Sequence, residues 1–318
     1  MTCEQVRKAT VMSGDSQTSQ AVLLVRPGAF GFHAEAAASN AFAQAASDPE
    51  IQSSVLKEFD GLADRLATAG VEVLVLDDEP KPSKPDAIFP NNWVSFHADG
   101  TLVLYPMATE SRRLERNVDG VKALLDSSGF EVRRLVDLSF HEHHGRFLEG
   151  TGSLVLDRPQ RRAYASRSAR THAHVVADFD DRLDYSTLVF DAHDCSGRPI
   201  YHTNVLLSVG SEFAVLCTAA LTPEYAPVLI GQIEASGRTV IEVDHDQLRQ
   251  FACNLTELKG RDGPVIALSS AALASFRPDQ LRQLERFGEL VDAPIPTIEQ
   301  VGGGSVRCMT AEVHLPRR

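Results

Sequence analysis

The chain has 318 residues, of which 43 are acidic and 31 are basic, so its formal net charge at pH 7 is -12. Nucleic acids and anionic membranes attract clustered lysine and arginine, whereas the basic residues here are scattered, which excludes both as default partners and favours a small molecule. Five irregularly spaced cysteines and the absence of an eighteen-residue apolar run predict a reduced, cytoplasmic protein without a disulfide framework, a structural metal or a membrane span.

The predicted elements alternate between strands and helices. Residues 1–19 are polar and rich in serine and threonine, and we expect them to form a loose tail ahead of one domain over residues 20–318. Short apolar runs predict strands, and apolar residues at helical spacing predict helices. In chain order we expect a strand at 21–25, an alanine-rich helix or loop without function at 34–46, a helix at 50–69, a strand at 71–76, a hairpin with arms IFPNNWVSF and TLVLYP, a helix at 112–127 and a strand at 131–135.

The sequence of hairpin, helix and strand then recurs. FLEGTGSLVLD and RRAYASRS form the arms of a second predicted hairpin, and YHTNVLLSV and EFAVLC form a third. A helix from Thr222 and the strand TVIEVD follow the third hairpin. Because the units are not identical in sequence, the pattern supports the α/β class and leaves a repeat architecture as a hypothesis.

Four polar clusters lie at the ends of apolar runs, where loops present side chains from a rigid scaffold. Three consecutive glycines precede Cys308, which we expect at a junction between a loop and a strand. A cysteine nucleophile needs a proton acceptor, which His202 supplies, and Glu149 can orient the imidazole or the substrate. The clusters are DAIFPNNW at 86–93, FLEGTGS at 147–153, YHTN at 201–204 and GGGSVRCM at 302–309.

Other chemistries have weaker signals. HEHHG at 141–145 lacks the HExxH spacing that brings two histidines to one face of a helix, so we predict no metal site there. The glycines at 302–304 have too few residues after them for a dinucleotide-binding unit, and neither a P-loop nor a GxSxG motif is present. Taken singly, Cys308, His202 and Glu149 would more often be a buried thiol, a structural histidine and a capping residue.

Taken together, the clusters resemble the guanidine- and ureido-group modifying enzymes of the pentein fold. This superfamily includes arginine deiminases, dimethylarginine hydrolases, amidinotransferases and arginine dihydrolases, and the closest resemblance over residues 21–316 is to the citrulline utilisation hydrolase, or arginine deiminase-related, branch. The resemblance implies a single-domain, five-bladed, pseudosymmetric α/β propeller without a cofactor, with Cys308 as nucleophile, His202 as general acid and base, and Glu149 as the carboxylate that partners the substrate and the histidine. The matching stretches are RPGAFGF, FPNNWVSFH, TLVLYPM, RRLER, FLEGTGSLVLDR, YHTNVLL and SVRCM.

Asparagines distinguish this chain from the arginine deiminases it resembles. Those enzymes have aspartates at the positions of Asn92 and Asn204, where they grip a guanidinium cation. An asparagine can donate a hydrogen bond to the carbonyl oxygen of a neutral ureido group, which a carboxylate would repel. The resemblance adds Asn91 and Asn40 as further substrate-binding residues.

Two arginines and one histidine are the remaining residues in the segments that match the superfamily. Arg112 and Arg113 resemble an arginine-rich segment that holds the α-carboxylate of the substrate, although a solvated helix face paired with Glu110 and Glu115 is an equal alternative. His33 stands where asparagine is expected in this branch, so we assign it no role.

The resulting hypothesis is a cysteine-dependent hydrolase that converts citrulline to ornithine, carbon dioxide and ammonia through a covalent thio-intermediate. Its partner is a small amino acid, and homo-oligomerisation is left open. The alternatives are an arginine deiminase or dihydrolase, an amidinotransferase, and a non-catalytic binding protein on the same fold.

Overall fold

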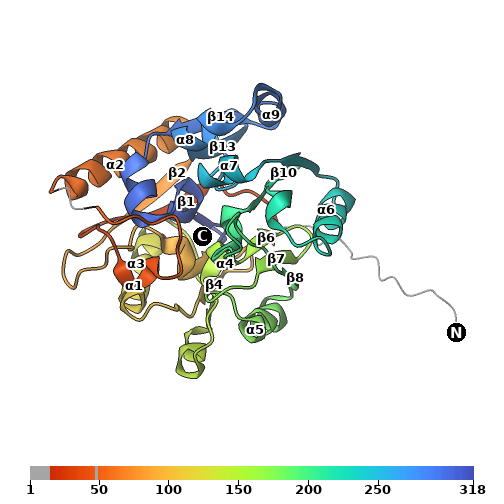
Figure 1. Cartoon of the computed structure of the whole chain (residues 1–318). Helices are drawn as coiled ribbons and strands as arrows, with labels where there is room; N and C mark the ends of the chain where they lie inside the picture. Colours follow the sequence, from red (N-terminus) through yellow and green to blue (C-terminus); the bar gives the residue numbers. More distant parts are fainter. Residues whose placement is uncertain (1–14, 47–48) are drawn as a thin grey trace, which may run out of the picture.

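A computed structural model describes residues 15–46 and 49–318, and within these ranges the strands form five sheets of three strands each (Figure 1). The predicted α/β class is confirmed, whereas the arrangement of the sheets as propeller blades stays a prediction. The strands, in sheet order, are β15 (Ala311–Val313), β1 (Ala21–Arg26) and β2 (Glu72–Asp77); β3 (Val94–Phe96), β4 (Thr101–Leu104) and β5 (Arg134–Asp137); β6 (Val155–Asp157), β7 (Arg162–Ser166) and β8 (Ser186–Phe190); β9 (Leu207–Val209), β10 (Phe213–Leu216) and β11 (Thr239–Glu242); β12 (Thr256–Lys259), β13 (Pro264–Ser269) and β14 (Glu289–Ala293).

Every sheet has the same pairing. The first two strands are antiparallel, and the third strand is parallel to the central one, so a crossover with a helix must join them. In the first sheet, β15 supplies the antiparallel strand, so the end of the chain pairs with its beginning. The recurring units expected from the sequence are therefore present, with their register set by hairpins and crossovers.

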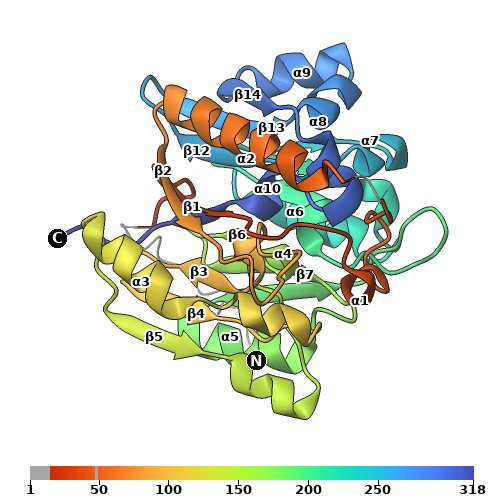
Figure 2. The same ribbon diagram turned by 90° about the vertical axis from the view of Figure 1, so that its left-hand side faces the viewer.

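The helices of the crossovers lie on the outside of the molecule. In Figure 1, α2, α3, α5, α6 and α9 surround the sheets and α4 lies near the middle, and Figure 2 places α2 and α3 on either side of β2. No helix within the described residues is long and apolar enough to cross a membrane. The helices are α1 (Ala34–Ala37), α2 (Ile51–Thr68), α3 (Val118–Ser127), α4 (Gly150–Ser153), α5 (Ala173–Leu183), α6 (Ala226–Ala235), α7 (His245–Arg249), α8 (Ser270–Ser275), α9 (Pro278–Leu284) and α10 (Val306–Met309).

Helix α2 shows why these segments fold as they do. Its buried residues Val55, Phe59, Leu62 and Leu66 recur every three or four positions and form one apolar stripe. That stripe packs against β2 and β14, which buries the outer face of the first sheet. Both the helix and the following strand match the expectation from the sequence within one or two residues.

Other boundaries differ from the expectation. The helix predicted at 112–127 begins only at Val118, because Asn117 accepts a hydrogen bond from the backbone of Gly120 and caps α3 there. The preceding residues form the 3-10 turn η2 (Ser111–Glu115). In the alanine-rich segment only α1 is helical, and the strand predicted at 131–135 is displaced to β5.

The predicted N-terminal tail lies partly outside the described residues, which begin at residue 15. Within the described part, Gln17 is buried, donates to the carbonyls of Leu156 and Val209 at 2.9 Å, and accepts from the backbone of Arg158. These bonds join the segment to the third and fourth sheets, so the folded part of the chain begins before residue 20. The assignment of a single domain stays a prediction.

Short turns precede the first strand of each sheet, and most of the predicted site residues lie in them. The turns at η1, α4, η4 and α10 are in mutual contact through α4 and η1. The fifth turn, residues 251–255, comes directly before β12. The turns with regular structure are η1 (Pro90–Asn92) before β3, α4 before β6, η4 (Thr203–Val205) before β9, and α10 before β15.

Candidate active site

A small cavity lies where these turns meet. Its volume is about 20 Å³, which is room for roughly one water molecule. Five residues singled out from the sequence line it, namely Cys308, His202, Asn92, Asn40 and Arg112. The other lining residues are Ala36, Asp86, Phe89, Arg170, Tyr201, Gly302, Gly303 and Gly304.

Cys308 lies in α10, with 3% of its surface exposed. Its backbone N–H donates to the carbonyl of Ser305 at 2.9 Å. Its Sγ accepts from two side-chain amides, Asn204 Nδ2 at 3.4 Å and Asn254 Nδ2 at 3.3 Å. Two N–H donors aimed at one sulfur can stabilise the negative charge that the sulfur carries as a nucleophile, because hydrogen bonds to a charged group are the stronger ones. Cys308 does not lie at the expected junction between a loop and a strand but in the short helix α10, which is followed by β15.

Glu149 and His202 form a buried pair beside Cys308. Glu149 is completely buried, and its Oε2 accepts from His202 Nε2 at 2.8 Å and from Arg170 Nη1 at 3.1 Å, while Arg112 lies 3.7 Å away. Burial alone would raise the pKa of Glu149, but Arg170, the hydrogen bond from His202 and Arg112 outweigh it and hold that pKa well below its ordinary value. Glu149 is therefore ionised.

Burial lowers the pKa of His202 to about 4, against the opposing effect of Glu149. His202 is therefore neutral near pH 7. Because an ionised carboxylate can only accept, His202 Nε2 carries the proton and Nδ1 keeps its lone pair. This arrangement leaves one ring nitrogen available for proton transfer.

The asparagines of the first cluster have different positions. Asn92 lines the cavity, and its Oδ1 accepts from Arg112 Nη1 at 2.9 Å. One hydrogen of Asn92 Nδ2 goes to Asn91 Oδ1 at 2.9 Å, which leaves the second hydrogen for a ligand. Asn91 does not line the cavity but lies behind Asn92 and orients its amide. On the other side of Cys308, Asn204 Oδ1 is buried without a hydrogen-bond partner among the described residues.

The two predicted arginines also occupy different positions relative to the cavity. Arg112 is 2% exposed, and its guanidinium forms two hydrogen bonds with Glu115, each of 2.9 Å. A solvated helix face is therefore wrong for Arg112, although Glu115 is indeed its partner. Arg113 points away from the cavity and pairs with Glu142 at 3.3 Å. Asn40 donates to the carbonyl of Gly303 at 3.1 Å, at the edge of the cavity.

Three charged or polar residues were missed by reasoning from the sequence alone. Asp86 lines the cavity, and its Oδ2 lies within hydrogen-bond distance, 2.8 Å, of His33 Nδ1. His33 therefore has a structural role. Arg170 joins Glu149 to the segment at Ser39 and Ala36 that covers the cavity. Asn254 contacts the sulfur of Cys308 from the fifth turn. Asp86 begins a cluster that the sequence did highlight, whereas no motif marks Arg170.

The histidine-rich segment lies away from this cavity. His141 Nε2 pairs with Asp178 Oδ2 at 2.9 Å, and Glu142 pairs with Arg113 and Arg116. Across residues 15–46 and 49–318, no three His, Cys, Asp or Glu side chains are grouped as metal ligands would be. Ion pairing therefore accounts for the conspicuous residues of this segment.

In comparison with protein families, the chain matches the family described as N,N dimethylarginine dimethylhydrolase, eukaryotic, over residues 26–315. No curated protein matches the sequence. The match covers all the site residues named above and confirms the relationship to the guanidino-group modifying superfamily expected from the motifs. The narrower placement in its citrulline branch stays a prediction.

Solved structures with the same fold include ArgZ, an arginine dihydrolase from the ornithine-ammonia cycle in cyanobacteria, at 17% identity and a TM-score of 0.72. The alignment covers 94% of this chain and 41% of the ArgZ chain, so this chain spans less than half of that protein's length. The N-terminal domain of ArgZ alone, as a cysteine-to-serine mutant bound to substrate, is covered to 99%, with 93% of this chain, 17% identity and a TM-score of 0.72. A cysteine-to-serine mutant of the dimethylarginine hydrolase DDAH from Pseudomonas aeruginosa, complexed with citrulline, has 13% identity and a TM-score of 0.63, with 92% of this chain and 99% of that chain covered.

We expect Gly150→Ala to disrupt the site. Gly150 has a φ of 45°, and a Cβ there would lie 2.1 Å from the backbone oxygen of Asn91, so the turn carrying Asn92 would have to shift. Urea unfolding should show a loss greater than the roughly 1 to 2 kcal/mol that a left-handed alanine costs by itself. Gly129→Ala is the matched control, because Gly129 has a φ of 79° with no atom within 4 Å of the added Cβ. Equal losses in the two variants would contradict the proposed contact.

We expect Asn254→Ala to slow alkylation of Cys308. Without one of its two amide donors the charged sulfur is less stabilised, so iodoacetamide labelling at pH 7 should fall about tenfold. Cys253→Ala is the control, because Cys253 is the neighbour of Asn254 in the same turn and its buried side chain lies in the hydrophobic core. Labelling of the exposed Cys195 in the same sample reports reagent quality. An unchanged rate at Cys308 in folded Asn254→Ala would show that this amide does not act on the sulfur.

Proposed function

The chain belongs to the N,N dimethylarginine dimethylhydrolase family, and on this basis we propose that it is a cysteine-dependent hydrolase of C–N bonds in a guanidino or ureido amino acid. The observation that carries the proposal is one cavity lined by both Cys308 and His202, with two amide donors on the sulfur and with Glu149 hydrogen-bonded to His202. Nucleophile, proton acceptor and orienting carboxylate are the parts that covalent hydrolysis requires. We propose citrulline as the substrate.

The reaction proceeds through Cys308. The thiol of Cys308 gives its proton to His202 Nδ1, and the resulting thiolate attacks the central carbon of the ureido group. His202 then protonates the departing nitrogen, and an S-acyl intermediate remains on the sulfur. A water gives its proton to His202 and attacks the intermediate, which restores the thiolate and releases a carbamate. The carbamate decomposes without the enzyme, so one water is consumed and ornithine, carbon dioxide and ammonia are formed.

The residues around the sulfur favour a neutral head group. Asn92 has one free N–H for a ureido oxygen, and the unpartnered Oδ1 of Asn204 can accept an N–H from the same group. Since a buried polar atom without a partner is costly, the orphan acceptor at Asn204 is a reason to expect a donor from the substrate. Carboxylates at these two positions would instead suit a cation.

The charged residues of the cavity lining suit the α-amino acid end of the substrate. Arg112 and Arg170 supply fixed positive charge for a carboxylate, and Asp86 supplies negative charge for an ammonium group. A zwitterionic amino acid matches this distribution. Because the cavity holds about one water, the segment with Ala36 and Asn40 has to move for such a substrate to enter.

Arginine is the second candidate, and Asp86 and Glu149 are the specific reason. Both carboxylates lie in or beside the cavity, so a guanidinium would also find acceptors there. The arginine dihydrolase fold neighbour is consistent with this alternative. Arginine would then be converted to ornithine through citrulline in two hydrolytic steps at the same cysteine.

A substrate panel tests the proposal. The purified protein should be incubated with citrulline, arginine, agmatine, succinylarginine and dimethylarginine, and amino acids and ammonia should be quantified over time. We expect citrulline to give equal amounts of ornithine and ammonia, and agmatine to react poorly because it lacks the carboxylate that Arg112 and Arg170 would bind. Cys308→Ser should be inactive and folded, since a hydroxyl is a far weaker nucleophile here. Turnover of dimethylarginine alone would overturn the choice of citrulline and retain the family activity.

We expect Asn92→Asp to reduce citrulline hydrolysis. The carboxylate still accepts the hydrogen bond from Arg112 but has no N–H for the ureido oxygen, a lost buried contact of about 1 to 3 kcal/mol, or roughly ten- to hundredfold in rate. With arginine offered, the ratio of ornithine to citrulline should fall in the variant. Asn117→Asp makes the same chemical change at the cap of α3 and should leave the rate unaltered. If Asn92→Asp makes ornithine from citrulline at the wild-type rate, Asn92 does not select a neutral head group.

A further inference from the structure

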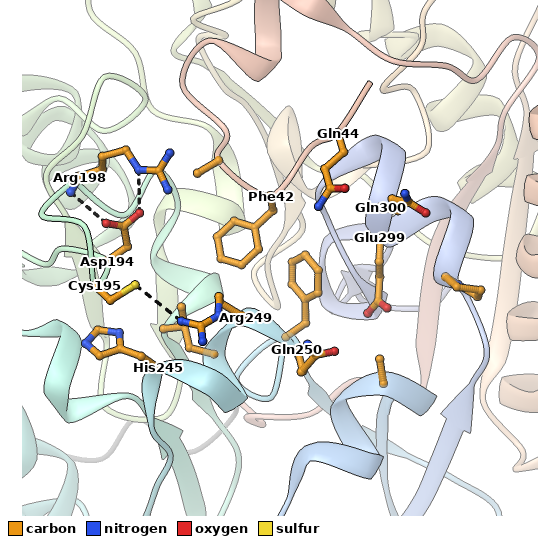
Figure 3. A pocket seen from close by; sticks show the side chains of 15 residues that line it. Phe42, Gln44, Asp194, Cys195, Arg198, His245, Arg249, Gln250, Glu299 and Gln300 are labelled. Carbon is orange, nitrogen blue, oxygen red and sulfur yellow. Dashed lines mark hydrogen bonds and ion pairs between the residues drawn. The ribbon is translucent and has the colours of Figure 1, made fainter. Parts of the chain in front are cut away.

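A second and larger pocket lies next to the catalytic cavity. We call it the outer pocket; it is lined by Phe42, Leu248, Arg249, Phe251, Glu299 and Gln300, among others, and its volume is about 410 Å³. In Figure 3 the side chains of Phe42, Arg249 and Glu299 project into the same space from three different segments. Its walls combine the apolar surfaces of Phe42, Leu248 and Phe251 with several charged and amide side chains, and a volume of a few hundred Å³ is typical of sites for small molecules.

The wall between the outer pocket and the catalytic cavity is well ordered by hydrogen bonds. The backbone N–H of Phe42 donates to Asn40 Oδ1 at 3.0 Å, and that of Gln44 donates to the carbonyl of Gln300 at 2.8 Å. Asn40 faces the catalytic cavity, whereas Phe42 and Gln44 face the outer pocket. The two spaces are therefore separate sites that share one wall.

Two aromatic rings form the apolar side of the outer pocket. The rings of Phe42 and Phe251 lie with centroids 5.0 Å apart, and Leu248 extends the apolar surface. Phe251 has a φ of 60°, a left-handed conformation that a bulky side chain rarely adopts. Such conformations cost free energy and are concentrated at functional sites, so the placement of this ring invites an explanation beyond packing.

One charge in the outer pocket lacks a counter-ion. Glu299 is 8% exposed, and its carboxylate accepts from Ser305 Oγ at 2.6 Å, but no lysine, arginine or histidine of the described residues lies within ion-pair distance of it. The two arginines that line the pocket are already paired, Arg198 with Asp194 and Arg249 with Asp246. Burial accordingly raises the pKa of Glu299. An uncompensated buried carboxylate is costly, and a bound cation would remove that cost.

We propose that the outer pocket is a binding site for an organic cation with an apolar stem, a primary amine or a guanidine, whose charged group pairs with Glu299 and whose stem packs on Phe42, Phe251 and Leu248. Ser305 holds the carboxylate from behind, so the acceptor is positioned before the ligand arrives. The proposal does not depend on the reaction at Cys308, because it rests on a different pocket and a different charge.

The test uses two probes of the same shape, 2-phenylethylamine and the uncharged 2-phenylethanol. The protein is used without alkylation, because iodoacetamide would also label the exposed Cys195, which lines the outer pocket, and because the catalytic cavity of about 20 Å³ is too small to hold either probe. Calorimetric titration at pH 7.5 should then show saturable one-to-one binding of the amine, with the alcohol at least tenfold weaker. Because both probes are compared on the unsubstituted protein, this result does not rely on any variant being folded.

Glu299→Gln supplies the second arm. Glutamine keeps the acceptor for Ser305 but removes the charge, so amine binding should weaken at least tenfold while alcohol binding is unchanged. Glu257→Gln is the matched control, because Glu257 is also a buried carboxylate with a raised pKa caused by burial, and it lies outside the outer pocket. Equal affinity for amine and alcohol, undiminished amine binding in folded Glu299→Gln, or the absence of saturable binding would each overturn the proposal.

Discussion

The buried carboxylate of Glu149 is the interaction on which the rest of the site depends. Placing an ionised carboxylate where no water reaches it costs several kcal/mol unless cations and donors surround it. Here Arg170, Arg112 and His202 come from three separate parts of the chain and converge on it. His202 and Arg170 donate hydrogen bonds to Glu149, whereas Arg112 lies 3.7 Å from it and is held by its own hydrogen bonds to Glu115. The position of His202 in the site is therefore tied to the satisfaction of this one charge.

That network also sets how Cys308 is activated. A histidine whose pKa is about 4 is neutral near pH 7 and cannot serve as the positive partner that a thiolate often has. The amides of Asn204 and Asn254 take that place with dipoles instead of charge. A site built on amides beside the sulfur suits a neutral substrate group, because no buried charge is left unpaired when the substrate departs. The electrostatics of the resting site and the proposed preference for a ureido group thus have the same origin.

Much of the fold could be predicted from local patterns, because the spacing of apolar residues indicates strands and helices that have one buried face. The strand at 21–25 and the helix at 50–69 were located within one or two residues. The helix predicted from 112 was wrong, since a 3-10 turn and a cap at Asn117 look helical in composition. Long-range contacts could not be predicted from such patterns. Only the tertiary fold brings Arg170 to Glu149 and to the segment at Ala36 that covers the cavity. Gln17 likewise joins two sheets, although its segment has the polar composition of a tail.

Asn254 shows that the repeat itself carries information that single motifs lack. Asn92, Glu149, Asn204 and Cys308 each come just before the first strand of a sheet, and the fifth sheet begins at β12. In five similar units whose first strands begin near a common centre, the turn before each strand faces that centre for the same geometric reason. The residue in the fifth turn should therefore also face the site, and Asn254 does so with its amide against the sulfur of Cys308. A chemically important position was thus predictable from topology, although no polar cluster marked it in the sequence.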